Sequence, residues 1–149
     1  MTHQTLALHG QVALVTGASS GLGHATALAL AQAGAEIVLM ARSAADLEQV
    51  ATELGSSGRR GIALPEDLSD EPYILNAVQR TIEVIGRIDL VVNAAGTDVP
   101  GEVAHLATSD WDYVVDVNLR APFLLAKAVF PHMRQARRMP RPTAPPNLA

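Results

Sequence analysis

The chain of 149 residues contains no cysteine. This absence excludes disulfide bonds, thiolate metal ligands and a cysteine nucleophile, and it fits a reducing compartment, so we expect a cytoplasmic protein. Long apolar runs are also missing. The most apolar region, residues 25–41, is interrupted by Gln32, Gly34 and Glu36, and it is too short for a membrane-spanning helix. The first ten residues carry no basic segment and no apolar core, so we expect no secretory signal.

The composition that remains is that of one globular domain. Hydrophobic residues make up 48% of the chain and charged residues 17%, which is ordinary for a chain long enough to bury a core. Residues 1–136 carry all 15 acidic residues and 8 of the 11 basic ones. An acidic body of this kind argues against a nucleic acid as the main partner.

Residues 137–149 form a segment of different composition. They contain Arg137, Arg138 and Arg141, no acidic residue, and four of the nine prolines of the chain. Because no periodic apolar pattern accompanies them, we predict a disordered tail that follows a domain over residues 1–136. A basic or proline-rich docking tail is one alternative. A shift of the reading frame in a GC-rich gene is another, since such codons specify Pro, Arg and Ala.

Short apolar runs alternate with segments of helical periodicity. Apolar runs typical of strands buried on both faces lie at residues 12–16, 36–41 and 88–93. A shorter run at residues 61–64 predicts one more strand. Helical patterns lie at residues 21–33, 44–54, from Ser69 to about Gly86, and from Thr108 or Ser109 to 136. This alternation predicts βαβ units and a parallel sheet with right-handed crossovers.

Side chains at the predicted helix starts and two prolines refine this interpretation. Ser43, Ser69 and either Thr108 or Ser109 are expected to accept hydrogen bonds as N-caps. Pro122 and Pro131 lie inside the last helical pattern. Proline removes a backbone donor and disturbs the preceding turn, so we expect this helix to be kinked or interrupted.

The segment between the first strand and the first helix is rich in glycine and serine. A helix that starts at the end of a parallel strand presents unpaired N–H groups and the positive end of its dipole, which together attract anions. Gly17 permits the tight turn, Gly21 lets the backbone approach a pyrophosphate, and Gly23 lets the helix pack closely on the strand. Ser19 and Ser20 add hydroxyl donors. A small-residue turn without a ligand is the alternative.

The spacing Thr16-Gly17-x-x-x-Gly21-x-Gly23 resembles the glycine motif of the short-chain dehydrogenase/reductase family. Asp67 matches the family's acid that contacts the adenine amino group, the segment Asn93–Gly96 matches the one that lines the cofactor site, and Asn118 matches the catalytic-helix asparagine. The resemblance covers the N-terminal half of the family, of the classical type. It implies that the dinucleotide is bound by Thr16, Gly17, Ser19, Ser20, Gly21, Leu22, Gly23, Arg42, Asp67, Leu68, Asn93, Ala94, Ala95 and Gly96.

Arg42 decides the expected choice of cofactor. An acidic residue at the end of the second strand would accept hydrogen bonds from a ribose 2′-hydroxyl and repel a 2′-phosphate. Met40, Ala41 and Arg42 stand there instead, and a guanidinium pairs well with phosphate. We therefore predict NADP(H) in preference to NAD(H). A surface arginine at a helix entry is the alternative.

The catalytic pair that the resemblance calls for, Tyr-x-x-x-Lys, is missing. In the family the tyrosine is the acid/base and the lysine lowers its pKa. Tyr73 and Tyr113 are the only tyrosines, Ala77 and Val117 stand four residues after them, and Lys127 is the only lysine. Asn118 is the single matched catalytic position. From the resemblance we expect an oxidoreductase that acts on carbonyl and alcohol groups, and from the missing pair we expect this chain to be inactive on its own. The alternative is a non-catalytic dinucleotide-binding fragment or an interaction partner of a full-length relative.

The family fold is a Rossmann-type, doubly wound parallel α/β sheet. The resemblance implies that this chain supplies about four strands in the order 3-2-1-4, which leaves the fourth strand at an edge. We expect self-association through this apolar edge and through the last helix, whose exposed side chains would be Leu119, Phe123, Leu124 and Val129.

Other polar and aromatic residues receive structural interpretations. Asp89 is expected to be a structural acid at a strand start, and Trp111 and Tyr113 are expected to be core or interface residues. His24 could touch a phosphate or face solvent. His105 and His132 lack the spacing of metal ligands, so no metal site is predicted.

Overall fold

The computed structural model describes residues 7–138. Its strands are β1 (Val12–Thr16), β2 (Glu36–Ala41), β3 (Gly61–Pro65) and β4 (Leu90–Asn93). Its helices are α1 (Gly21–Gln32), α2 (Ala44–Ser56), α3 (Glu71–Ile85), α4 (Thr108–Val115) and α5 (Ala121–Ala136), with a 3₁₀ turn at Val103–His105 and a π-helical turn at Asp116–Arg120. The elements and their order agree with the sequence-based expectation. The predicted tail lies outside the described residues, apart from Arg137 and Arg138.

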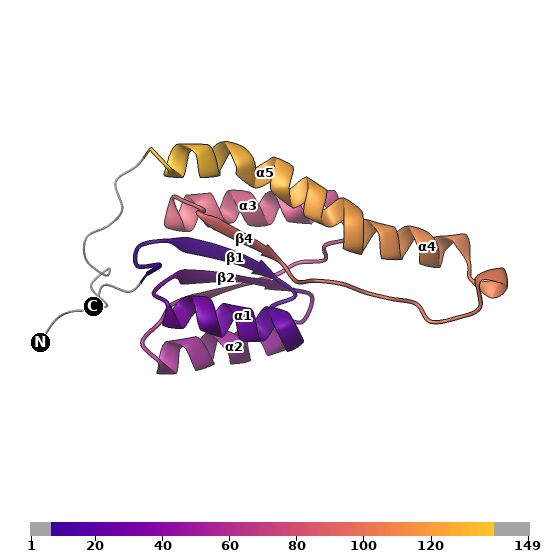
Figure 1. Cartoon of the computed structure of the whole chain (residues 1–149), viewed down its shortest axis with the longest axis horizontal. Coiled ribbons are helices and arrows are strands. Elements are labelled where there is room, and N and C mark those ends of the chain that lie inside the picture. The colour runs from indigo at the N-terminus through magenta and orange to yellow at the C-terminus, as the bar shows by residue number, and fades with distance from the viewer. Residues whose placement is uncertain (1–6, 139–149) are drawn as a thin grey trace, which may run out of the picture.

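All four strands are parallel and follow the order β3-β2-β1-β4. Val12 pairs with Glu36 and Ala13 pairs with Leu90, so β1 is central and β4 is at one edge of the described sheet. Helices cover both faces: α1 and α2 lie on one side and α3 and α5 on the other (Figure 1). This is the predicted Rossmann-type, doubly wound arrangement.

The alternation of side chains along β1 divides the interior into two cores. Val12 and Leu14 pack with α3 and α5, whereas Ala13 and Val15 pack with α1 and α2. β1 is buried along its whole length and β2 nearly so, which explains why their sequences are apolar at nearly every position, with Thr16 and Glu36 as the exceptions, rather than at alternate ones. These buried strands fix the positions at which the four carboxyl ends meet.

The N-caps agree only in part with the sequence. Ser43 caps α2, because its hydroxyl accepts a hydrogen bond from the backbone N–H of Asp46 at 3.3 Å. The assignment of Ser69 is wrong: α3 begins at Glu71 with Asp70 as its cap, and the Ser69 hydroxyl donates to Asp67. The prediction of Thr108 or Ser109 as a cap is also wrong: the N-cap position of α4 is Ala107, which makes no side-chain capping hydrogen bond, and Thr108 and Ser109 lie in the first turn.

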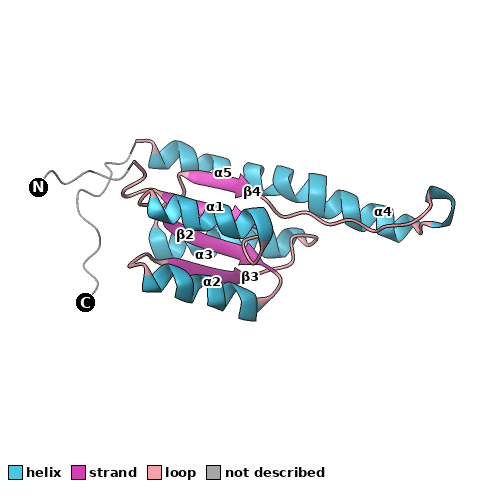
Figure 2. Cartoon of the chain, turned by 60° about the horizontal axis from the view of Figure 1, so that its bottom comes forward, coloured by secondary structure: helices cyan, strands magenta, loops and turns pink. Residues whose placement is uncertain are grey.

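The last helical region is interrupted beside Pro122, one of the two prolines at which an irregularity was predicted, whereas α5 continues through Pro131. A π-helical turn at Asp116–Arg120 separates α4 from α5, and Pro122 follows in the first turn of α5. The proline ring would crowd the carbonyl four residues earlier in a regular helix, and that residue, Asn118, lies in the wider π turn. α4 extends past the ends of the strands (Figure 2).

The exposed face of this region differs from the expected one at two positions. Leu119 and Phe123 are 70% and 64% exposed, as predicted. Leu124 and Val129 are buried, contrary to the prediction, because they belong to the core that α5 forms with α3. The buried stripe of α5 is therefore set by its contact with α3, while Leu119 and Phe123 project on the other side.

Candidate functional site

A cleft of ≈ 760 Å³ opens at the carboxyl ends of the strands. Its walls come from the segments that follow all four strands and from the helical region that carries Tyr113 and Val117. The cleft includes the point where β1 is flanked by β2 on one side and β4 on the other, so the connections diverge there. Open parallel sheets bind their ligands at this kind of switch point.

The glycine loop after β1 forms one wall, and each glycine has a separate reason. A Cβ on Gly17, whose φ is +65°, would lie 2.7 Å from the Cα atom of Ala95. A Cβ on Gly23 would lie 2.1 Å from the carbonyl oxygen of Gly17, so this position allows α1 to approach the loop. Gly21 has a φ of +53° and nothing within 4 Å of its Cβ position, so the backbone there can be approached from outside.

The N-terminus of α1 is suited to an anion. Ser20 occupies its N-cap position without a side-chain capping hydrogen bond, and the first turn contains no acidic residue. The first backbone N–H groups and the positive end of the helix dipole therefore remain available beside the cleft, which Ser19, Ser20, Gly21 and Leu22 line. His24 does not line the cleft, and its Nε2 atom lies 2.8 Å from Glu53 Oε2 on α2.

Thr16 supports the opposite wall without lining the cleft. Its side chain is buried, and its hydroxyl oxygen accepts hydrogen bonds from the backbone N–H groups of Ala94 at 3.1 Å and Ala95 at 3.2 Å. The hydroxyl itself donates to the carbonyl of Val92 at 3.4 Å. One buried side chain on β1 thereby holds the segment that leaves β4.

Most of the predicted cofactor residues meet in the cleft. The ones that line it are Gly17, Ser19, Ser20, Gly21, Leu22, Arg42, Asp67, Leu68, Ala94, Ala95 and Gly96. Thr16, Gly23 and Asn93 do not line the cleft. The sequence did not indicate the other lining residues, which are Ala41, Ser43, Asp46, Glu66, Thr97, Tyr113 and Val117.

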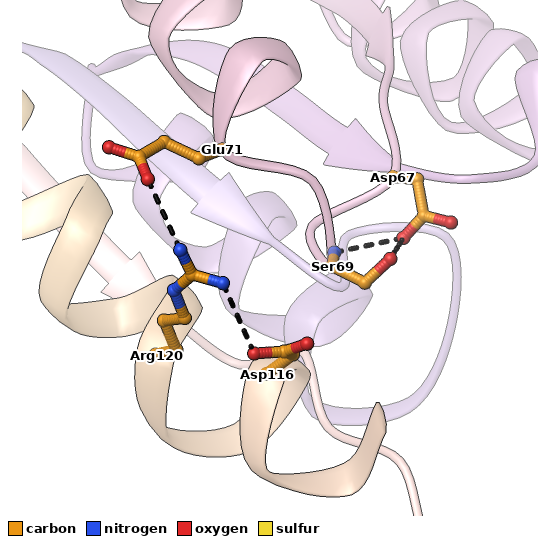
Figure 3. Close-up of polar contacts among 5 residues, drawn as sticks. All are labelled: Asp67, Ser69, Glu71, Asp116 and Arg120. Atoms are coloured by element: carbon orange, nitrogen blue, oxygen red, sulfur yellow. Dashed lines mark hydrogen bonds and ion pairs between the residues drawn. The ribbon is translucent and has the colours of Figure 1, made fainter. Parts of the chain in front are cut away.

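Asp67 is fixed in a turn at the wall that follows β3. Its Oδ1 atom accepts hydrogen bonds from both the backbone N–H and the hydroxyl of Ser69, each at 2.9 Å. Arg120 braces the neighbouring wall: it contacts Glu71 at 3.3 Å and Asp116 at 3.5 Å, and so links the π turn to the start of α3 (Figure 3). The contacts of Arg120 join the start of α3 to the π turn, whose Val117 lines the cleft.

Asn118 acts on the chain that follows β4. Its Oδ1 atom accepts from the backbone N–H of Thr97, and its Nδ2 atom donates to the carbonyl of the same residue, both at 2.8 Å. Thr97 lines the cleft whereas Asn118 does not. In this structure the predicted catalytic position therefore holds a cleft wall in place.

Arg42 and Tyr113 meet across the cleft. The Nη1 group of Arg42 donates a hydrogen bond to the phenol oxygen of Tyr113 at 2.8 Å. The helical spacing of Tyr113 had predicted a core or interface residue. No local pattern reveals the contact, because 71 residues separate the partners.

Asp89 has the structural role expected of it, and it lies away from the cleft. It accepts a hydrogen bond from the backbone N–H of Val12 at 2.9 Å and pairs through both carboxylate oxygens with Arg87. The hydrogen bond to Asp89 raises the pKa of Arg87, against the lowering effect of burial. The hydrogen bond from Val12 to Asp89 joins the amino ends of β1 and β4, and the ion pair with Arg87 holds the Asp89 carboxylate beside Val12.

Within residues 7–138, no group of acidic or histidine side chains could hold a metal ion, and no helix is long and apolar enough to cross a bilayer.

A family model described as short chain dehydrogenase matches residues 11–139. The chain belongs to the short-chain dehydrogenase family.

Curated relatives are similar to this short-chain dehydrogenase chain along most of its length. The (2S)-[(R)-hydroxy(phenyl)methyl]succinyl-CoA dehydrogenase subunit BbsD of Thauera aromatica is 35% identical over 128 residues, which are 86% of this chain and 52% of the relative. The oxidoreductase UcpA of Salmonella typhimurium is 38% identical over 126 residues, which are 85% of this chain and 48% of the relative. The chain thus spans about half the length of the curated relatives it matches.

Solved short-chain dehydrogenase structures have the same fold. A metagenomic short-chain oxidoreductase in complex with NADP has a TM-score of 0.84 and 38% identity, and the match covers 88% of this chain and 60% of that one. L-sorbose reductase from Gluconobacter frateurii, complexed with NADPH and L-sorbose, has a TM-score of 0.85 and 31% identity over 89% of this chain and 51% of that one.

Proposed function

We propose that the cleft binds NADP(H), so that this chain provides the dinucleotide-binding part of a short-chain oxidoreductase. The observation that carries the proposal is the combination of a glycine loop, an uncapped α1 N-terminus and Arg42 around one cleft. The presence of NADP or NADPH in two of the solved relatives supports it.

The residues present fit a dinucleotide at several separate points. The N–H groups at the start of α1, with Ser19 and Ser20, would hold the pyrophosphate. Asp67 would accept a hydrogen bond from the adenine amino group, and Arg42 would pair with a 2′-phosphate. When bound, the cofactor would supply hydride chemistry, and Ala94–Gly96 would line its site.

We further propose that these 149 residues bind the cofactor without turning over a carbonyl substrate. Reduction of a carbonyl needs a proton donor beside the developing alkoxide. Tyr113 is the one tyrosine that lines the cleft, and its phenol oxygen is engaged by Arg42. Lys127, the only lysine, lies on α5 and is not among the cleft residues.

Titration with NADPH tests the proposal directly. Nicotinamide fluorescence of the purified chain is followed against NADPH and, in parallel, NADH, for the native chain and for Arg42→Ala. We expect saturable binding that favours NADPH. Loss of a charge-assisted hydrogen bond should weaken NADPH binding by roughly tenfold, with little effect on NADH. Absence of binding would reject the cofactor assignment, and equal affinities for NADPH in the native chain and the variant would reject the role of Arg42.

A second proposal concerns partners: the chain self-associates, or pairs with a full-length relative, through β4 and the last helix. β4 is an edge strand of the described sheet, and Leu119 and Phe123 expose large apolar surfaces. Sedimentation of the native chain should show dimers or larger species, and Phe123→Glu should shift the distribution toward monomer. A native chain that sediments as a monomer at high concentration would contradict self-association.

A further inference from the structure

Among residues 7–138, one side-chain hydrogen bond, that between Arg42 and Tyr113, joins the end of β2 to α4 across the cleft. Both residues line the cleft, and the bond measures 2.8 Å. Within residues 7–138 Arg42 forms no ion pair with a carboxylate. Resting on the function proposed above, we propose that Tyr113 is a positioning residue that holds the Arg42 guanidinium for a 2′-phosphate and so increases the preference for NADPH over NADH.

The chemistry of the pair matches a phosphate. In this bond the guanidinium donates and the phenol oxygen accepts, so the hydroxyl hydrogen of Tyr113 remains to be donated elsewhere. The remaining N–H groups of Arg42 are also donors. The pair therefore presents several donors to the cleft, which suits a phosphate, whose oxygens accept, better than it suits a 2′-hydroxyl.

Preorganisation gives the second reason. A solvent-exposed arginine loses up to about 2 kcal/mol of side-chain entropy when a ligand immobilises it. A tyrosine side chain has only two rotatable angles, so it can hold the guanidinium at a smaller entropic cost. When Tyr113 has already restricted Arg42, less of the phosphate interaction is lost to ordering.

The position of Tyr113 is itself fixed by neighbouring contacts. α4, which carries Tyr113, continues directly into the π turn at Asp116–Arg120. That turn is held to Thr97 by both polar atoms of Asn118 and to the start of α3 by Arg120. The phenol therefore reaches Arg42 from a braced helix rather than from an unsupported loop.

A double-mutant cycle with Tyr113→Phe and Arg42→Ala tests this role. NADPH and NADH dissociation constants are measured for the native chain, both single variants and the double variant. Tyr113→Phe keeps the ring and removes only the hydroxyl, so we expect NADPH binding to weaken by about three- to tenfold and NADH binding to change less than twofold. In the Arg42→Ala background, the same change should have less than a twofold effect.

Tyr73→Phe on α3 is the matched control, because Tyr73 is 49% exposed and does not line the cleft. An equal loss of NADPH and NADH affinity in Tyr113→Phe would indicate a general structural role and overturn the inference. So would an unchanged NADPH affinity. If Arg42→Ala selectively weakens NADPH while Tyr113→Phe does not, only this inference fails. If Arg42→Ala is also without effect, the assignment of Arg42 fails with it.

Discussion

Replacement of Thr16 by valine should loosen the wall of the cleft that follows β4. Valine has nearly the same shape as threonine, so the change keeps the volume of the buried site and removes only the hydroxyl. In the native chain that hydroxyl accepts from Ala94 and Ala95. After the substitution, the two N–H groups lose their acceptor in a part of the protein that water reaches only in part.

The size of the effect follows from those two donors. A fully buried donor without an acceptor costs about 1–3 kcal/mol. Ala94 and Ala95 are half-buried, so water recovers part of this cost, and we expect a loss of about 2 kcal/mol in the free energy of unfolding. For a domain of this size, each 1 kcal/mol lowers the melting temperature by roughly 3 °C, so the midpoint should fall by about 6 °C.

Urea unfolding followed by circular dichroism measures this change. The urea concentration at the midpoint of unfolding should fall while the m-value stays unchanged, because the surface exposed on unfolding stays the same. Thr52→Val is the matched control: Thr52 is exposed on α2, and its hydroxyl bonds only to the carbonyl of Glu48, so its loss should stay within about 0.5 kcal/mol. A Thr16→Val variant as stable as Thr52→Val would refute the argument that the hydroxyl holds this wall.

Two further predictions, each with a control variant, follow from the geometry. Gly23→Ala places a Cβ 2.1 Å from the Gly17 carbonyl oxygen and should abolish NADPH binding in the fluorescence titration. Gly21→Ala, with open space at its Cβ position, should lower the unfolding free energy by only about 1–2 kcal/mol through backbone strain, as measured by thermal unfolding. An equal loss of unfolding free energy in the two glycine variants would contradict this assignment of the two positions. Asp89→Asn leaves the nearly buried Arg87 unpaired and should lower the unfolding free energy by about 3 kcal/mol, whereas the exposed Asp98→Asn should not. At temperatures well below the midpoint of thermal unfolding, Asp89→Asn should bind NADPH with the same affinity as the native chain, because the ion pair lies away from the cleft.

The strands were predictable because their burial is almost complete. β1 and β2 have the bounds that their apolar runs indicated, since only a strand covered on both faces needs an apolar side chain at every position. The fourth strand is two residues shorter than predicted. Asp89 is used in hydrogen bonds to Val12 and Arg87, so ladder pairing begins at Leu90.

The features that sequence analysis missed depend on contacts between distant segments or on competition between neighbours. Ser69 resembles an N-cap, but its hydroxyl bonds to Asp67 two residues earlier, so the helix starts later. The contact of Tyr113 with Arg42 arises only when α4 is placed above the end of β2. Likewise Leu124 and Val129 became buried because α5 packs on α3, which periodicity alone does not reveal.

The two bonds between Asn118 and Thr97 have a consequence for how this part of the protein can change. One side-chain amide satisfies both polar groups of a single backbone residue, which is what an adjacent strand does for its neighbour in a sheet. A carboxylate would lack the donor, and an aliphatic chain would lack both groups. The cleft wall that follows β4 ends at Thr97, the residue that Asn118 holds, and residues 98–107 do not line the cleft. We therefore expect insertions and deletions among related sequences to fall within residues 98–107, and the residue at position 118 to stay an asparagine.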